Sequence, residues 1–205
     1  MRNTPVLVAD AGSTDGTADI VKSFQDRLRL EVIPGGVPSV GRNAGAARAK
    51  TKYVLFIDAD VQPADKSLIR HTLQAAEKKN LECLTTNIIC HDCSWLDKAF
   101  YLGNNFFQYL SRLHKPFSTG MFMLFEKSRF DQLGGFNPQI LFAEDYYLSK
   151  QVKRSKFAIV RGGVYTTNRR FQKMGHARVA RLFFWTAFNF WNQKYFLRDH
   201  KYWAQ

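Results

Sequence analysis

The chain has 205 residues and carries 30 Lys and Arg against 17 Asp and Glu, a formal net charge of +13. This length favours one domain with a sizeable core, and the charge favours anionic partners such as nucleotide phosphates, lipid headgroups or nucleic acid. No apolar run is long enough to cross a bilayer and no signal-peptide pattern opens the sequence, so it indicates no membrane-spanning segment.

The first fifty residues alternate strand-like and helix-like patterns. Short apolar runs predict strands at residues 6–9, ending on Asp10, and at residues 30–33. Apolar residues at helical spacing between 20 and 28 predict a helix, with Ser13, Thr14 or Asp15 as its N-cap. Residues 39–50 are small and rich in alanine, which predicts a second helix able to pack close to a sheet.

The run Tyr53-Val54-Leu55-Phe56-Ile57 predicts a strand buried on both faces, and it ends on Asp58-Ala59-Asp60. Side chains two residues apart in an extended segment point the same way, so the two carboxylates project together from the carboxyl end of the strand. Open α/β sheets bind ligands at that end. Paired carboxylates there suit Mg²⁺ or Mn²⁺ held together with substrate phosphates. The alternative is a strand end capped by solvated aspartates.

The rest of the chain continues the alternation, which predicts an α/β layer. We expect helices near residues 65–76, 126–133 and 146–153, and strands at 81–89, 120–125 and 157–160. Residues 95–113 read as a helix or a partly ordered flap. Gly134-Gly135 is expected to end the helix before it.

The three cysteines, without a secretory signal, fit a reducing compartment better than a disulfide framework. Two of them lie in Cys90-His91-Asp92-Cys93, which has half the ligands of a zinc site, but no second Cys/His pair accompanies it. We therefore expect structural thiols, with a bound metal as the weaker alternative. His114 and His176 fall in no ligand pattern.

Four motifs follow one another in a characteristic order. They are Asp10-Ala-Gly-Ser-Thr-Asp-Gly-Thr17 after a strand, Gly41-Arg42-Asn43-x-Gly45 opening a helix, Ile57-Asp-Ala-Asp60 ending a strand, and Leu133-Gly-Gly-Phe136 followed by Glu144-Asp145. Each is weak alone, but the ordered set, over roughly residues 6–171, resembles the family 2 glycosyltransferases with the GT-A fold. The resemblance implies a Rossmann-like mixed, mostly parallel sheet flanked by helices, in a domain of residues 1–175 followed by an aromatic and basic helical segment at 176–205.

The resemblance also implies a role for individual residues. It places Asp10 at the nucleoside end of a donor pocket and Arg42 in the base or phosphate region, with Asp15 and Asn43 as further donor contacts. Asp58 and Asp60 would face the ribose and a metal-bound diphosphate, Asp145 would be the general base, and Arg169 and Arg170 would steady the departing diphosphate.

The implied reaction moves a sugar from a UDP- or GDP-linked donor to an acceptor hydroxyl or a lipid phosphate. A Mg²⁺ or Mn²⁺ ion would assist, and the acceptor would be a carbohydrate or a lipid-linked molecule. A single carboxylate base without a second nucleophile suits one displacement with inversion. In this interpretation Glu144 serves as a helix cap, and a solvated basic turn is the alternative for Arg169 and Arg170.

The chain departs from the family pattern at two places. Many members carry two adjacent aspartates where this chain has Asp10-Ala11, and a first strand and helix should precede Val6. Without that strand, the strands at 6–9 and 53–57 must pair with each other or leave polar backbone groups unpaired. We therefore expect a less stable protein that self-associates through the gap, as a homo-oligomer, and holds the nucleoside poorly. A catalytically impaired, membrane-associated module with the GT-A fold is therefore an alternative function for this chain.

Residues 179–191 are rich in Phe and Trp, Phe190 among them, and basic residues flank them. The segment is too short to span a bilayer, so we expect an interfacial helix that brings the site to a lipid-linked acceptor at the cytoplasmic face of a membrane. Packing against another part of the protein or a second subunit is the alternative.

Two rival functions remain at this stage. A phosphatase of the haloacid dehalogenase type would use Asp58 and Asp60 as nucleophile and acid, Thr85 for phosphate, and Glu144-Asp145 for metal. A non-catalytic membrane or RNA-binding module is the other. The sequence lacks the aromatic signature and the basic helix stripe of RNA-binding domains, so we expect no nucleic-acid partner.

Overall fold

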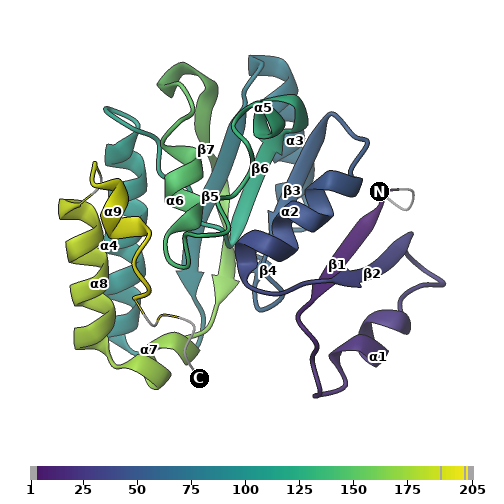
Figure 1. Ribbon diagram of the computed structural model, residues 1–205, viewed down its shortest axis with the longest axis horizontal. Helices are drawn as coiled ribbons and strands as arrows, with labels where there is room; N and C mark the ends of the chain where they lie inside the picture. Colours follow the sequence, from purple (N-terminus) through teal and green to yellow (C-terminus); the bar gives the residue numbers. More distant parts are fainter. Residues whose placement is uncertain (1–3, 190, 201, 203–205) are drawn as a thin grey trace.

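The computed structural model describes residues 4–189, 191–200 and 202, and its strands form two separate sheets (Figure 1). In the smaller sheet, β1 (Val6–Asp10) pairs in parallel with β2 (Leu30–Pro34). α1 (Thr17–Lys22) connects them and buries none of its residues. α2 (Pro38–Arg48) lies close to β1, because Gly41 has no side chain: a Cβ there would come within 3.0 Å of the Ala9 Cβ.

The larger sheet has five strands in the order β3-β6-β5-β7-β4. They are β3 (Tyr53–Ile57), β4 (Gln62–Pro63), β5 (Cys83–Cys90), β6 (Phe122–Glu126) and β7 (Phe157–Thr166). β5 and β7 pair in parallel, whereas β6 runs antiparallel between β3 and β5, and β4 runs antiparallel to β7. β3, β5 and β7 therefore share one direction, and their carboxyl ends meet at one edge, as expected for a mixed α/β layer.

Helices flank both faces of this sheet (Figure 1). They are α3 (Leu68–Lys79), α4 (Trp95–Ser111), α5 (Lys127–Gln132), α6 (Glu144–Ser149), a short 3₁₀ helix (Arg154–Lys156), α7 (Arg169–Met174), α8 (His176–Phe188) and α9 (Gln193–Phe196). Residues 95–111 are thus a helix and not a flap. α4 is fixed to β5 by Asn105, whose side chain exchanges hydrogen bonds with the backbone of Ile88 at 2.9 and 2.8 Å.

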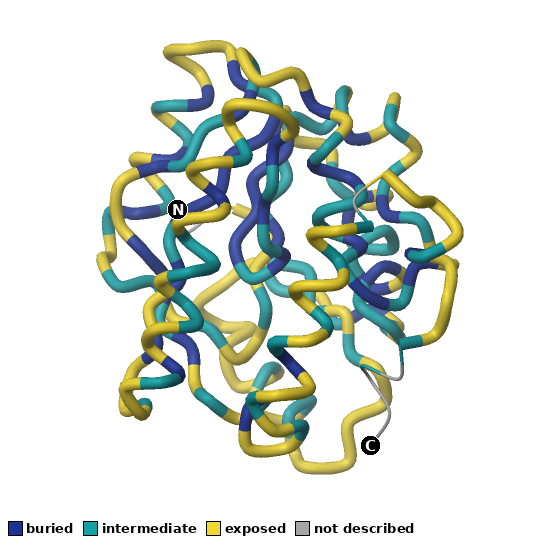
Figure 2. The backbone as a smooth tube through the Cα atoms, turned by 90° about the vertical axis from the view of Figure 1, so that its left-hand side faces the viewer, coloured by how far each residue is buried: buried dark blue, intermediate teal, exposed yellow. Residues whose placement is uncertain are grey.

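The hydrophobic core lies on both faces of the five-stranded sheet. Alternate residues of β6 point to opposite sides: Met123 and Phe125 join one cluster of buried side chains, and Phe122 and Leu124 join the other. All four are at most 1% exposed. Figure 2 shows this buried central backbone inside an exposed shell. Burial of a side chain of this size contributes about 1.5–3 kcal/mol.

The two sheets are not joined by strand pairing. Within the described residues β1 pairs only with β2, and β3 only with β6. Of the two outcomes expected from the sequence, the structure adopts the second: β1 and β3 do not pair with each other, and each has one strand partner among the described residues. Self-association and low stability stay predictions.

Two local predictions were wrong. α1 is capped by Gly16, in a left-handed conformation with φ +81°, and no side chain caps it. Asp15 instead accepts hydrogen bonds from the Thr17 amide and hydroxyl, at 3.1 and 2.5 Å, which ties it to the turn. Cys90 and Cys93 form a disulfide in place of free thiols, because the left-handed turn at Asp92 brings their Cα atoms to 5.8 Å.

The remaining local predictions agree with the structure or differ from it only in the length of an element. Cys83 is free and buried, as expected for a structural thiol. α6 is shorter than the predicted helix, and β7 runs six residues beyond the predicted strand end at residue 160, to Thr166. In the part of the chain that the structure describes, no helix is long and apolar enough to cross a bilayer. α8 begins at His176, and the division of the chain into a domain of residues 1–175 and a segment of 176–205 stays a prediction. Phe190, Lys201 and residues 203–205 lie outside the described residues.

Candidate active site

The site is built around Arg42, which α2 holds beside the carboxyl end of β3. Its guanidinium donates to Asp58 Oδ1 at 2.6 Å and to Glu144 Oε1 at 2.7 Å. Only 13% of the Arg42 side chain is exposed, so both ion pairs are largely shielded from water. Gly120 makes this arrangement possible, since a Cβ there would lie 2.5 Å from Arg42 Nη2. Glu144 therefore binds Arg42, and the interpretation of Glu144 as a helix cap was wrong: no side chain caps α6.

Asp145 lies next to this ion-pair cluster. Its Oδ2 accepts from the Gly120 amide at 2.5 Å, and its Oδ1 accepts from the Tyr146 amide at 2.7 Å. The residue is partly exposed, yet desolvation by surrounding protein atoms raises the pKa of its carboxyl, against the opposing effects of Arg42 and the Gly120 hydrogen bond.

The neighbouring Glu144 carboxyl has a pKa raised to about 7. Burial is the main cause, the charge of Asp145 adds to it, and Arg42 offsets only part of these two effects. The site thus holds two adjacent carboxyl groups whose pKa values are both raised, which is common where groups take part in proton transfer.

Asp60 projects from the same strand end and pairs with Arg169 of α7, with 3.0 Å between Oδ2 and Nη2. Both side chains are open to solvent, at 46% and 68% exposure. Arg170 lies over the ring of Tyr202 at 4.0 Å, and that ring lies 4.7 Å from the ring of Phe142. Arg170 is thus packed against an aromatic ring, whereas Arg169 is exposed; the role of both arginines at a diphosphate stays a prediction.

Asn43 is partly buried against the turn that follows α5. Its side-chain amide donates to the Phe136 carbonyl at 2.7 Å and accepts from the Phe136 amide at 3.0 Å. Gly135 has φ +69°, and a Cβ there would lie 2.7 Å from Asn43 Oδ1. Asn43 therefore positions this turn against α2, and its donor contact stays a prediction without support from this geometry.

Asp10 is the last residue of β1 in the smaller sheet, and Asp15 lies in the loop that follows it. Asp10 accepts from the hydroxyl of Ser13 at 2.5 Å, and this bond lowers the pKa of its carboxyl, as the Thr17 hydroxyl does for Asp15. Both are thus ionised acceptors. No hydrogen bond or ion pair among the described residues joins this loop to Arg42 or Asp58.

The model of glycosyl transferase family 2 matches residues 2–134, which is more than half of the chain. This chain belongs to that family. Validoxylamine A glucosyltransferase from Streptomyces hygroscopicus subsp. jinggangensis is 36% identical over 38% of this chain and 20% of its own length. The chain thus spans about a fifth of the curated relatives that it matches.

Solved glycosyltransferases share the fold. TarS 1–349 from S. aureus, in complex with UDP-GlcNAc, superposes with a TM-score of 0.60 and 16% identity, over 80% of this chain and 49% of that one. The mannosyltransferase PcManGT from Pyrobaculum calidifontis, with GDP-Man and Mn²⁺, gives 0.61 and 16% identity, over 85% and 52%. The GT-A fold predicted from the motifs is confirmed.

The family membership removes the phosphatase alternative, and the geometry agrees. Thr85, the residue required to bind phosphate in that interpretation, is fully buried inside the sheet, and its hydroxyl donates to the Phe122 carbonyl at 2.9 Å. It has no access to a ligand. Asp58, the required nucleophile, is held by Arg42.

Several positioning residues of this family 2 site were missed in the sequence. Gly120 and Tyr202 carry no motif that could have revealed them. Asp97 is 1% exposed and accepts from Ser94, Asn168 and His176. Burial raises its pKa, but these hydrogen bonds outweigh that effect and lower it to about 2. The spacing of Ser94 and Asp97 is a capping-box signal for α4, but nothing in the sequence indicates that Asp97 also fixes the residue before Arg169.

The carboxylates at the end of β3 fit a divalent cation. Among the described residues no three His, Cys, Asp or Glu side chains gather as a complete metal site. Magnesium and manganese bound to nucleotides need only one or two carboxylates, since phosphate oxygens and water complete the coordination. Asp60 offers an exposed carboxylate, and Asp58, 35% exposed, keeps one oxygen that Arg42 does not bind.

Proposed function

We propose that this site transfers a sugar from a UDP- or GDP-linked donor to an acceptor hydroxyl or lipid phosphate, with inversion. One observation carries the proposal: Arg42 gathers Asp58 from the end of β3 and Glu144 beside Asp145 into one cluster. A donor-side carboxylate and a base-side carboxylate are thereby held by the same guanidinium. The named ligands of the structural relatives, UDP-GlcNAc and GDP-Man, support a nucleotide-sugar donor.

The donor would lie along the carboxyl edge of the sheet. Asp10 and Asp15 would receive the nucleoside. Asp60, with Asp58, would hold Mg²⁺ or Mn²⁺, and the bound ion would withdraw charge from the diphosphate. The exposed guanidinium of Arg169 can leave Asp60 for the diphosphate at low cost, since solvent-exposed ion pairs are weak.

Asp145 acts on the acceptor. Its carboxylate takes the proton of the acceptor hydroxyl while the hydroxyl oxygen forms a bond to the anomeric carbon of the sugar. The bond from that carbon to the phosphate oxygen breaks, and the nucleoside diphosphate leaves with both electrons of that bond. Desolvation raises the pKa of the Asp145 carboxyl, and this makes it a better proton acceptor near neutral pH. One displacement inverts the configuration at the anomeric carbon.

The test is release of nucleoside diphosphate from a panel of nucleotide sugars with added acceptors. Replacing Asp145→Asn should lower kcat by roughly two to four powers of ten, the usual effect of losing a general base, with donor affinity near that of the wild type. Asp131→Asn serves as the matched control, because Asp131 is an exposed carboxylate paired with Lys127 outside the site. Loss of donor binding in Asp145→Asn, or release of inorganic phosphate in place of the nucleotide, contradicts the proposal.

A further inference from the structure

α4 and α8 expose an unusual amount of apolar surface. We call the surface formed by Leu102, Phe106 and Leu110 of α4 with Phe184, Trp185 and Phe188 of α8 the α4–α8 face; these six side chains are 46–68% exposed. On α4 they follow one another at intervals of four residues, and thus form a stripe along the helix. Soluble proteins rarely expose contiguous apolar patches of this kind unless they bind a partner.

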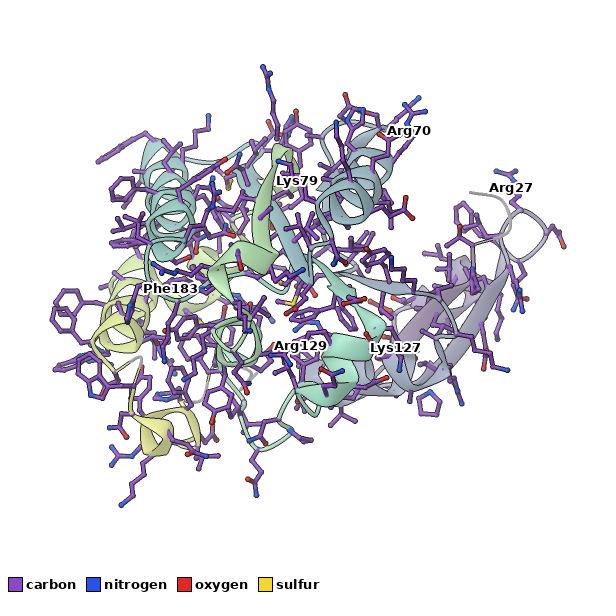
Figure 3. All side chains as sticks on the ribbon, turned by 90° about the horizontal axis from the view of Figure 1, so that it is seen from above. Arg27, Arg70, Lys79, Lys127, Arg129 and Phe183 are labelled. Atoms are coloured by element: carbon purple, nitrogen blue, oxygen red, sulfur yellow. A yellow bond between two sulfur atoms is a disulfide. The ribbon has the colours of Figure 1, made fainter. Side chains whose placement is uncertain are left out.

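The two helices lie side by side. Figure 1 and the view from above in Figure 3 both show α4 and α8 along the same side of the molecule, away from β1 and β2. A partly buried contact joins them at one end, where His176, the first residue of α8, bonds to Asp97 of α4 at 2.6 Å. Their exposed apolar side chains therefore belong to one surface.

Apart from the buried Asp97 in the first turn of α4, the charged residues of these two helices are basic. The sequence contains no Asp or Glu between residues 98 and 125 or between residues 146 and 198. Arg178 and Arg181, one turn apart on α8, line a cavity of about 440 Å³ together with Leu182, Trp185, Tyr195 and His200. An anionic ligand suits this groove, whereas a second copy of the chain would bring like charges together.

We propose that the α4–α8 face lies on an anionic lipid bilayer. The Phe, Trp and Leu side chains would enter the boundary between headgroups and acyl chains, as those of interfacial helices do. Arg178 and Arg181 would bind lipid phosphates in the adjoining groove. The sequence indicated an interfacial helix at 179–191; the structure adds α4, which widens one helix into a two-helix platform. The platform is independent of the proposed transfer reaction, although Asp97 links it through Asn168 to the segment carrying Arg169.

Co-sedimentation with vesicles tests the proposal. The whole chain should bind vesicles of equal parts phosphatidylcholine and phosphatidylglycerol, and should not bind phosphatidylcholine alone. Binding should weaken as salt screens the charges. The double change Arg178→Gln with Arg181→Gln should lower the partition coefficient roughly ten- to thirtyfold. Lys78→Gln with Lys79→Gln, two exposed basic residues at the end of α3, is the matched control and should bind as the wild type does.

A second pair of variants tests the apolar part. Phe106→Ser with Phe184→Ser should lower binding at least tenfold, whereas Ile20→Ser with Phe24→Ser, exposed apolar residues of the α1 region, should not. Circular dichroism checks that each variant is folded, and the arginine pair remains decisive should the serine variants misfold. Equal loss in the control pairs, equal binding to neutral and anionic vesicles, or pelleting without vesicles through self-association overturns the proposal.

Discussion

The five-stranded region and the β1–β2 region of this protein differ in how completely their strands are buried. β6 is buried on both faces, between two hydrophobic clusters. β1, by contrast, is only partly buried along its length, and α1 beside it buries no residue. The smaller sheet has one strand pair and packs on α2 through the contact of Gly41 with Ala9, the buried side chain of Ile33 and the ion pair of Glu31 with Arg48. One chain therefore combines a complete core with an incomplete one.

The difference has a functional consequence because the proposed site spans both regions. Arg42, Asp58 and Asp145 lie at the edge of the five-stranded sheet and are held by short ion pairs and hydrogen bonds, whereas Asp60 makes a separate, exposed ion pair with Arg169. Asp10 and the loop after it depend on the smaller sheet. The diphosphate end of a donor should thus meet a rigid site, and the nucleoside end a weakly supported one.

The largest effect on stability is expected from replacing a leucine in the five-stranded sheet, compared with a leucine in the smaller sheet. Leu124→Ala in β6 should lower the free energy of unfolding by about 2–5 kcal/mol, because Leu124 is 1% exposed in a tightly packed core. Leu7→Ala in β1 should cost less than half as much, since Leu7 is partly exposed. Urea unfolding measures both. Equal losses would mean that the β1–β2 region is as well packed as the rest.

The sequence predicted local elements well and their assembly only in part. The apolar run placed β3 correctly, because strand formation is a local property. The chain turns at Ala59 and Asp60, so Asp58 and Asp60 are not two residues of one extended strand, and they pair with different arginines. The position of β6 between β3 and β5 depends on contacts between residues far apart in the chain, which local patterns do not encode.

Likewise, Arg42 meets carboxylates 16 and 102 residues away, and no periodicity encodes such pairs. The ends of elements also escaped prediction where a backbone turn decided them, as at Gly16 and Asp92. Family resemblance, and not residue patterns, supplied the reaction.

A smaller difference between the two regions is expected in how their stability depends on pH. Glu144 has a folded-state pKa of about 7, above its ordinary value of 4.5, so between these values the folded protein holds a proton that the unfolded chain has lost. Stability contributed by Glu144 therefore falls as pH rises from about 4.5 to 7, and Glu144→Gln should remove this slope.

Asp10 shifts in the opposite direction. Its pKa is lowered from 3.8 by the Ser13 hydroxyl, so its contribution is present above pH 3.8 and is lost only as pH falls below it. Asp10→Asn should thus leave the slope between pH 4.5 and 7 unchanged. Melting temperatures of both variants across this range decide the matter; an unchanged slope in Glu144→Gln would show that this carboxyl is not the one that titrates.

The most direct test of the account is a calorimetric titration of UDP and GDP with and without Mn²⁺. We expect the wild-type protein to bind at least one of these nucleotides more tightly with Mn²⁺ present, because Asp60 and the diphosphate hold the ion together. Asp60→Asn should lose this metal-dependent gain and keep its melting temperature, whereas Asp65→Asn, an exposed carboxylate bonded to the Ser67 amide, should keep the gain. Equal nucleotide affinity with and without Mn²⁺ in the wild type would contradict the account.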